Sequence, residues 1–475
     1  GLGGFWIQST TPDESASTSE GLFILTGEEI PPVQSGDLVQ VTGKVREPSQ
    51  QTALQPATSA DVVVLSSGNA LPAPIPLNPP ESESEAAAYY EALEGMLVSV
   101  DEGVVEGPTS KYGETVFVLP EHAQTHLLRW HENGFAIMVD DGSSASYATL
   151  NELPYAANAG DTIRNVSGPL AYTYGRYKIE PLTMEVVPTE HTLPTIAPAA
   201  EGQFSIMTWN AENFFDTRVP HPSNPPLPTR SEYQRDLAKA AATIQAAGAP
   251  TIVALQEIEN IGVLEDIAAQ DALAGYDYQA VLIEGHDSRG IDVGYLVRGD
   301  QAEILDVQQF DAPEGLTSRP PLMLHVRIGS REVYVINNHF TSMAGGVEAT
   351  EPRRNAQAAW NVKLVQDIQA QNPDAWIVVL GDLNSFYDSL PLDTLRAAGL
   401  RHVFESLPEA ERYTYIYQGE AQTLDHILVT EPMWNALARV EVLHVNADFT
   451  LPDENDTSPR RKSDHDPVVA VFEGR

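Results

Sequence analysis

Apolar residues in the first 190 positions come in short runs separated by Gly, Pro, Ser and Asp, a pattern typical of β-strands. Residues 71–80 (LPAPIPLNPP) are dense in proline and predict an extended linker, whereas Glu and Ala over 81–93 favour a short helix. The clearest strand segments are Phe5–Ile7, Leu22–Leu25, Leu38–Val41 and Val62–Leu65.

A weak internal repeat links two parts of this region. We therefore expect two small β-barrels of one type, over residues 1–70 and 95–190, joined by residues 71–94. The alternative is that two unrelated β-domains share common turns. Residues 191–203 predict a second linker. The repeat matches Gly36-Asp37, Gly43 and Leu54-Gln55-Pro56 with Gly160-Asp161, Gly168 and Ile179-Glu180-Pro181, and Phe5–Gln8 with Phe135–Met138.

The pattern changes at Phe204, and from there to residue 475 buried strands alternate with helical stretches. This alternation predicts an α/β domain. The helices are expected over Ser231–Gln245 and Asn355–Gln371. The strands are expected over Phe204–Trp209, Ile252–Gln256, Val293–Val297, Val333–Asn337, Ile377–Leu380, His426–Val429 and Val468–Phe472.

Composition limits the chemistry that the chain can perform. A chain of 475 residues is too long to form a single hydrophobic core. It has no cysteine, which excludes disulfides and thiolate sites, so a metal ion must bind to carboxylate, amide or imidazole groups. Such ligands favour Mg²⁺, Mn²⁺ or Ca²⁺. The net charge of −40 opposes a nucleic-acid partner at long range, but physiological salt screens charges beyond about 8 Å.

Several predicted strands of the α/β domain begin or end at a polar residue. Sites in α/β folds assemble from strand ends at one edge of the sheet. Phosphodiester hydrolysis needs a hard cation, which Glu257 and Asp464 can hold, and a histidine supported by an aspartate to activate water. Each residue alone has a structural alternative, such as a turn, an N-cap or a core histidine. The polar residues are Asn210, Glu257, His339, Asp382, Asn384, Asp425, Asp464 and His465.

Together these stretches resemble the endonuclease/exonuclease/phosphatase superfamily, which includes deoxyribonuclease I. The resemblance implies a four-layer α/β sandwich over residues 204–475, made of two packed mixed sheets flanked by helices. It also implies preceding OB-like barrels, the first truncated at its N-terminus, as in bacterial secreted nucleases. The matching stretches are TWNAENFFD (208–216), VALQEIEN (253–260), RGIDVGYLVR (289–298), INNHFTS (336–342), VLGDLNS (379–385), TLDHILV (423–429) and SDHDPV (463–468).

The resemblance also implies roles for individual residues. His465 is the general base and Asp425 the acid that orients it, while His339 protonates the leaving 3′ oxygen with Asp292 as its partner. Asp382 and Asn384 lie near the attacked phosphorus. The metal-side residues are Glu257, Asp464 and Asn210.

Arginines are the candidate phosphate ligands. Arg319 resembles a phosphate-contacting arginine, although a surface arginine before a proline turn is an equal alternative. Arg460 and Arg461 precede the Ser463-Asp464-His465 stretch, and their alternative role is to neutralise nearby carboxylates in a loop. The complete set of phosphate-binding candidates is Arg319, Arg353, Arg354, Arg460 and Arg461.

We therefore expect a secreted, Mg²⁺- or Mn²⁺-dependent endonuclease with low sequence preference, acting on DNA or on RNA as well, with Ca²⁺ as an alternative structural ion. We expect no membrane partner, because no apolar stretch approaches the ~20 residues that cross a bilayer. One rival is a phosphodiesterase of the same superfamily acting on phospholipid or inositol phosphate. Another is a binding or adhesion protein whose catalytic domain is inactive.

Overall fold

The computed structural model describes residues 3–13, 15–27, 31–124, 126–221 and 223–474. The chain divides into two compact units. No helix among the described residues is long and apolar enough to cross a membrane. The first unit contains Gly1–Glu190 with Tyr417–Glu420 and Phe449–Leu451, and the second contains His191–Ile416, Ala421–Asp448 and Pro452–Arg475.

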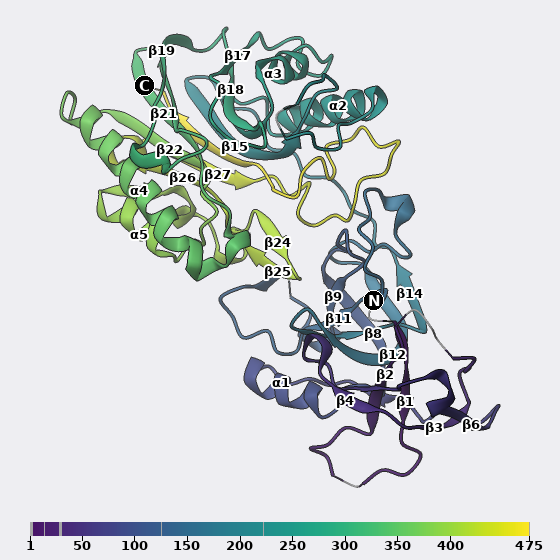
Figure 1. Ribbon diagram of the computed structural model, residues 1–475. Helices are drawn as coiled ribbons and strands as arrows, with labels where there is room; N and C mark the ends of the chain where they lie inside the picture. The colour runs from purple at the N-terminus through teal and green to yellow at the C-terminus, as the bar shows by residue number, and fades with distance from the viewer. Residues whose placement is uncertain (1–2, 14, 28–30, 125, 222, 475) are drawn as a thin grey trace. The chain divides into compact units, whose positions relative to one another are not determined.

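Two six-stranded sheets form the centre of the second unit (Figure 1). Each sheet has one parallel pair, β15 with β16 and β21 with β22, and its other pairs are antiparallel. Both sheets are therefore mixed. The first sheet has the order β17 (Tyr278–Leu282), β18 (Asp292–Arg298), β16 (Ile252–Ile258), β15 (Gln203–Phe214), β28 (Val468–Glu473), β27 (Leu437–Val442). The second has the order β19 (Glu303–Gln309), β20 (Leu322–Ile328), β21 (Arg331–His339), β22 (Trp376–Asp382), β26 (Asp425–Thr430), β23 (Leu400–His402).

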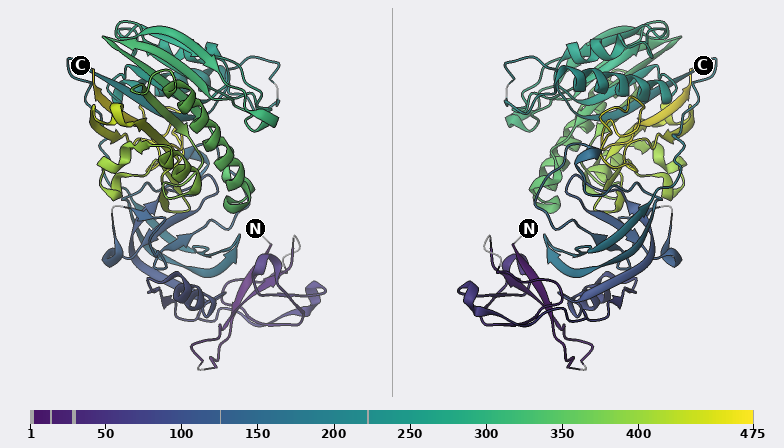
Figure 2. Two further views of the ribbon diagram at one scale, coloured as in Figure 1. Left: turned by 90° about the vertical axis from the view of Figure 1, so that its left-hand side faces the viewer. Right: turned by 90° about the vertical axis from the view of Figure 1, so that its right-hand side faces the viewer.

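The central strands are covered on both faces, since every residue of β16 and β22 is buried. One face of each sheet packs against the other sheet, through side chains such as Phe204, Tyr295 and Phe472. Helices cover the two outer faces (Figure 2). The second unit is thus a four-layer α/β sandwich, as predicted. The helices are α2 (Arg230–Ala246) and α3 (Ile261–Ala268) on the first sheet, and α4 (Val347–Gln369) and α5 (Leu390–Ala397) on the second.

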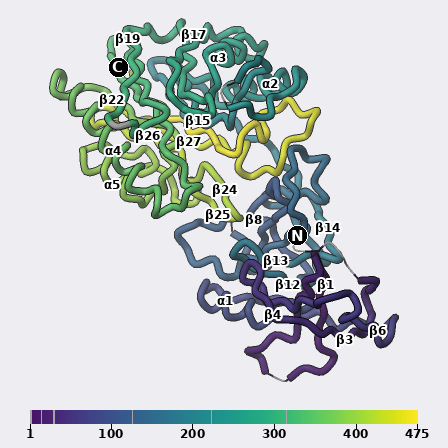
Figure 3. The backbone as a smooth tube through the Cα atoms, viewed as in Figure 1, coloured from purple at the N-terminus to yellow at the C-terminus, as the bar shows by residue number. Residues whose placement is uncertain are grey.

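All seven predicted strands of this unit are present, and each extends further than predicted. The extensions carry polar residues: β16 continues to include Glu257, β21 to include His339 and β22 to include Asp382. The last strand, β28, pairs with β15 at the start of the unit, so the yellow end of the chain runs beside its teal middle (Figure 3). These long strands bring distant polar residues to the same sheet edge.

The segment predicted as a second linker is partly packed. Ile196 is buried in the core between the first sheet and its helices, and its N–H donates to the carbonyl oxygen of Ala246 (2.7 Å). Residues 191–203 are therefore not a free linker, because an apolar side chain anchors them to the second unit.

The first unit is built mainly of β-strands. Its central five strands close on themselves, since β8 pairs with β9, β9 with β11, β11 with β13, β13 with β12, and β12 again with β8. Val98, Val105 and Phe117 lie in the core, and α1 (Glu83–Glu91) adds Ala86 and Tyr90. The strands of this barrel are β8 (Leu97–Gly107), β9 (Thr115–Val118), β11 (Ile137–Val139), β12 (Thr162–Thr173) and β13 (Arg176–Ile179), with β14 (Thr183–Val187) paired to the start of β12.

The N-terminal strands form an open arrangement rather than a closed barrel. A four-stranded sheet has the order β1-β2-β5-β4, and among the described residues β3 pairs with β6 alone. Each of the four strand segments predicted in this region is found as a strand. The bounds are β1 (Gly4–Gln8), β2 (Gly21–Leu25), β3 (Leu38–Val41), β4 (Lys44–Arg46), β5 (Ala53–Gln55) and β6 (Val62–Ser66).

Candidate active site

Polar residues at the strand ends of both sheets meet at one edge of the sandwich. In the second sheet His339, Asp382 and Asp425 are neighbours on three adjacent strands, because His339 pairs with Asp382 and Asp382 with Asp425. Asn210 of the first sheet donates from its side-chain amide to Asp382 Oδ2 (3.0 Å), which connects the two sheets. Residues from four strands therefore form one buried polar cluster.

His465 and Asp425 form a hydrogen-bonded pair in this cluster. His465 Nδ1 lies 2.7 Å from Asp425 Oδ2, and the Thr414 hydroxyl donates to the same oxygen (2.8 Å). The backbone of His465 is fixed because its carbonyl oxygen accepts from Trp209 Nε1 (3.0 Å) and Asn446 Nδ2 (2.7 Å). When the ring is neutral, this pair places its proton on Nδ1 and leaves Nε2 as an acceptor.

The charges around His465 decide its protonation. Burial alone would lower its pKa, but the carboxylates of Asp425, Asp382 and Asp464 together raise the pKa well above the usual value for histidine. Any cation that neutralises these carboxylates would oppose this rise. The basicity of His465 is therefore set by the negative charge gathered beside it.

Asp382 and Asn384 are held by a tight turn after β22. The Asn384 backbone N–H donates to Asp382 Oδ1 (2.8 Å), and its side-chain amide lies 3.1 Å from Asp382 Oδ2. Gly381, just before Asp382 in β22, lets β21 approach closely: its φ is +130°, and a Cβ there would lie 1.9 Å from the Asn338 carbonyl oxygen. Burial raises the pKa of Asp382. The turn thus presents a carboxylate and an amide at a single place.

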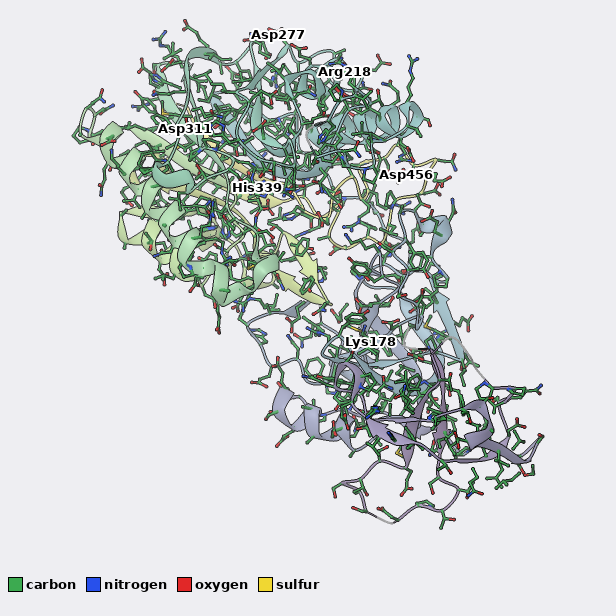
Figure 4. All side chains as sticks on the ribbon, viewed as in Figure 1. Lys178, Arg218, Asp277, Asp311, His339 and Asp456 are labelled. Atoms are coloured by element: carbon green, nitrogen blue, oxygen red, sulfur yellow. The ribbon has the colours of Figure 1, made fainter. Side chains whose placement is uncertain are left out.

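His339 faces two carboxylates of the cluster, and Figure 4 labels it at the end of β21. Its Nε2 lies 3.5 Å from Asp382 Oδ2 and 3.7 Å from Glu257 Oε1, while its buried Nδ1 has no hydrogen-bond partner among the described residues. Burial and the positive charges of Arg319 and Arg289 lower the pKa of His339 well below the usual value. The lowered pKa favours a neutral imidazole, and a proton on Nε2 would face the two carboxylates.

The predicted partnership between Asp292 and His339 is absent. Asp292 Oδ1 instead accepts from the Gly285 backbone N–H (2.7 Å), and burial raises the pKa of Asp292 to about 7. The carboxylate supports the 285–292 loop, because β18 begins at Asp292 and the loop folds back over it. Strand β18 places Asp292 near the site, but the hydrogen bond of its side chain stabilises the 285–292 loop.

The predicted arginines fall into two groups. Arg319 is buried and bonds to Asp287 and to the carbonyl oxygens of His339 (3.3 Å) and Phe340 (3.0 Å), so it fixes the backbone behind His339. Arg354 is only 1 % exposed and bonds within the first turns of α4, to Thr350 and Val347, an arrangement that does not present it to a phosphate. These two arginines support the fold around the site.

The remaining predicted arginines lie on loops. Arg353 donates to the carbonyl oxygens of Gly315 (2.9 Å) and Leu316 (3.1 Å). Arg460 lies 3.5 Å from Asp456 Oδ2, which agrees with its alternative role as a counter-charge. Arg461 donates to the carbonyl oxygen of Ser463 (3.2 Å), next to the His465 loop.

Two charged residues near the site were not predicted. Arg289 is 46 % exposed and lies 4.0 Å from Glu257 Oε1 and 3.4 Å from Asp287 Oδ1. Glu212 follows Asn210 by two residues in β15, and the nearby charge of Asp464 raises its pKa. Both lie in stretches that carry the family resemblance, TWNAEN and RGID, which was the signal that could have identified them.

The carboxylates at the mouth of the site are suitable ligands for a hard cation. Among the described residues, no three His, Asp or Glu side chains are grouped so that they could hold a metal ion by themselves. Mg²⁺ does not require such a cage, because it commonly uses one or two carboxylates together with water and substrate phosphate. Glu257, whose Oε2 accepts from Asn213 N–H (2.7 Å), and the part-exposed Asp464 supply oxygen ligands of this kind.

Comparison with known proteins gives matches to both units. Residues 205–448, just over half of the chain, match the Endonuclease/Exonuclease/phosphatase family, and residues 55–192 match a domain of unknown function. No curated protein matches the chain.

Several solved structures are similar to the chain. A truncated TDP2 from Caenorhabditis elegans is 20 % identical, with a TM-score of 0.42, covering 57 % of this chain and 97 % of that one. TDP2 from D. rerio, complexed with a single strand DNA product, is 18 % identical, with a TM-score of 0.41 and coverages of 57 % and 98 %. The human nocturnin catalytic domain with bound sulfate is 17 % identical, with a TM-score of 0.42 and coverages of 57 % and 93 %.

The family match spans the strands and loops that carry Asn210, Glu257, His339, Asp382 and Asp425. The chain belongs to the endonuclease/exonuclease/phosphatase family, whose members hydrolyse phosphodiesters or phosphate esters.

Proposed function

We propose that this chain is a metal-dependent nuclease that cleaves DNA, and RNA as well, within the strand and with little sequence preference. The observation that carries the proposal is the His465–Asp425 pair, which lies beside Asp382, Asn384 and His339 at one edge of the sandwich. A complete set of base, orienting acid, amide and carboxylate groups favours catalysis over a purely binding role.

The base in this mechanism is His465. Asp425 accepts the Nδ1 proton of His465, so Nε2 of the neutral ring can take a proton from a water molecule. That water attacks the phosphorus of a phosphodiester, and the P–O3′ bond breaks on the opposite side. Asp425 then stabilises the imidazolium that forms, as a buried carboxylate does in other histidine-based sites.

The amides and cations of the site would stabilise the phosphate. Asn210 and Asn384 are neutral donors beside Asp382, and Arg289 brings positive charge to the mouth of the site. His339 is neutral, so we assign it donation of a hydrogen bond from Nε2 to the leaving oxygen rather than full protonation at the outset. Glu257 and Asp464, with Glu212 nearby, would hold Mg²⁺ or Mn²⁺, which would polarise a phosphate oxygen.

Little in the structure favours a lipid substrate. The exposed large apolar residues of the second unit, such as Val219, Ile283 and Leu390, are spread over separate elements instead of forming one patch. Arg289 and Arg461 fit a phosphate backbone.

Export from the cell is proposed by family resemblance only, and detection of the protein in culture medium would test it.

We also propose that the closed five-stranded barrel is OB-like and binds single strands. OB folds are five-stranded Greek-key barrels that bind oligonucleotides. Tyr174, in the turn between β12 and β13, is 81 % exposed. An exposed aromatic ring suits base stacking.

The proposed function is tested by offering supercoiled plasmid, linear duplex, single strands, RNA, sphingomyelin and an inositol phosphate, each with Mg²⁺ or EDTA. Nicking of the plasmid with Mg²⁺ supports an endonuclease. Release of nucleotides only from ends, or turnover of the lipid or inositol phosphate alone, would assign a different family activity. The His325→Gln variant is a matched control, because His325 contacts Glu332 on β21, apart from the cluster.

A further inference from the structure

We propose that two buried histidines, His426 and His402, are positioning residues that hold the Asp382–Asn384 turn from behind. They act through the backbone of Ser385 rather than by contact with substrate. The proposal rests on the proposed function, because that function places Asp382 and Asn384 beside the phosphate.

The two rings form a chain of hydrogen bonds that has a backbone group at each end. The Phe404 N–H donates to His402 Nδ1 (3.0 Å), and His402 Nε2 lies 2.8 Å from His426 Nδ1. His426 Nε2 in turn lies 2.8 Å from the Ser385 carbonyl oxygen. Both side chains are fully buried, and they lie on the neighbouring strands β23 and β26 of the second sheet.

The backbone groups at the two ends fix the positions of the protons. An N–H can only donate and a carbonyl oxygen can only accept, so His402 Nδ1 must be an acceptor and His426 Nε2 must be a donor. In neutral rings each proton then lies on Nε2, and the proton of His402 is donated to His426 Nδ1. A single arrangement of protons therefore satisfies every bond of the chain.

Burial keeps both rings neutral, as this arrangement requires. It lowers the pKa of His402 well below the usual value for histidine, and the positive charge of Arg396 adds to this shift. Burial also lowers the pKa of His426 to about 4, although the bond to Ser385 and the charge of Asp425 oppose the change. The hydrogen-bond chain is therefore intact at neutral pH.

The bond from His426 holds the peptide group that leaves the turn. Asn384, directly before Ser385, has a φ of +44°, a left-handed conformation that persists only where its neighbours hold it. On the other side of Asn384, the Leu383 N–H donates to the Leu424 carbonyl oxygen (3.0 Å). The Asn384 amide is thus fixed by one backbone bond before it and one after it.

Strand β26 also connects the turn to the general base. Successive side chains of a strand point to opposite faces, so Asp425 bonds to His465 while His426 bonds to Ser385. The same strand therefore positions the base and the turn relative to each other, and the two histidines contribute the second of these links.

The test compares two substitutions of His426. The glutamine amide has a donor and an acceptor on adjacent atoms, as the neutral ring does, so His426→Gln can keep the bond to Ser385, whereas His426→Leu cannot. We expect kcat for plasmid nicking to fall at least about tenfold in His426→Leu with KM close to native, and to stay within about threefold of native in His426→Gln.

Thr430→Val is the matched control. It removes the buried bonds of the Thr430 hydroxyl to Ala375 (2.8 Å) and Ile377 (3.1 Å), at the opposite end of β26 from the site. It should lower the melting temperature and leave kcat near native. Native kcat in His426→Leu, or equal losses in His426→Leu and His426→Gln, would overturn the proposal.

Amide hydrogen exchange separates this proposal from the proposed function. The Asn384 N–H should exchange at least about tenfold faster in His426→Leu than in the native chain or in His426→Gln. A native chain without hydrolytic activity would refute the proposed function, while exchange would still show whether His426 holds the turn. Unchanged exchange in His426→Leu would overturn the proposal.

The protons of the two rings can be observed in the native chain, even if His426→Leu does not fold. Nitrogen NMR of histidine-labelled protein at neutral pH should show two neutral rings protonated on Nε2, assigned by the loss of each signal in His402→Gln and His426→Gln. A proton on Nδ1 of either ring would overturn the proposal.

Discussion

At the scale of single residues, substrate binding depends on which arginine side chains are exposed at the site. Arg289 and Arg354 are both arginines near the second sheet, yet one is 46 % exposed at the site and the other is buried in α4. This contrast allows binding and stability to be separated by a pair of matched substitutions.

We expect Arg289→Met to raise KM for nucleic acid by about tenfold with the melting temperature unchanged, since one phosphate contact is lost. Arg354→Met should lower the melting temperature and leave KM of the remaining folded enzyme close to normal. Steady-state kinetics and thermal melting of both variants measure these effects. A normal KM in the Arg289 variant would remove that residue from substrate binding.

Sequence alone identified most of the polar cluster, because motifs such as SDHD and GDLN are short and local. It could not assign contacts that depend on packing. The Asp292 carboxylate accepts from the Gly285 N–H, and Arg354 bonds within its own helix. Which side chain fills which space is decided by the tertiary structure.

At the scale of elements, burial on both faces made most central strands easy to predict, while the edge strands and the inner strand β20 were missed. Strands β17, β19 and β27 are mostly part-buried and carry polar or charged residues among their apolar ones, so they lack the continuous apolar run of a central strand. Helix α4 begins at Val347, eight residues earlier than predicted, although Pro352 lies inside it. The early start of the helix is stabilised by Arg354, because its side chain bonds to Val347 and Thr350 in the first turns.

The β13 strand carries a buried charge whose effect on stability can be measured. Lys178 is 2 % exposed, and its Nζ lies 2.8 Å from Asp140 and 2.5 Å from Glu114. Burial opposes its charge, but these two carboxylates more than compensate and raise its pKa above 10.5. Lys178→Met should lower the free energy of unfolding of the first unit by about 3–5 kcal/mol, because two carboxylates lose their partner.

The pH dependence of this loss follows from the raised pKa. The contribution of Lys178 is fully present below the unfolded pKa and disappears as pH rises through the higher folded pKa. The difference between the native chain and the Lys178→Met variant should therefore be constant up to about pH 10 and shrink above it. Denaturant titrations across that range would contradict the account if the difference grew with pH.

At the scale of the whole molecule, the second unit contains all residues of the proposed mechanism and has its own core. It should fold alone when the chain begins at His191. A chain that begins at Phe204 lacks Ile196 and should melt several degrees lower, because the pocket for that side chain is left empty. Equal melting temperatures of the two truncations would show that Ile196 contributes little.

The same truncation tests the proposed role of the barrel. The His191–Arg475 segment should keep hydrolysis of short oligonucleotides and bind long single strands more weakly, because an attached binding surface is lost. Tyr174→Ala in the full chain should weaken single-strand binding by a smaller factor. Unchanged affinity in both proteins would exclude the barrel from substrate binding.

The central claim is that His465, oriented by Asp425, activates water beside a metal-bound phosphate. The most direct measurement is the rate of plasmid nicking by the native chain, His465→Ala and His325→Gln, each with Mg²⁺ and with excess EDTA. We predict nicking by the native chain and His325→Gln with Mg²⁺, loss of about 10²–10⁴ in kcat for His465→Ala, and no nicking in EDTA. Near-normal nicking by His465→Ala with Mg²⁺, or by the native chain in EDTA, would contradict it.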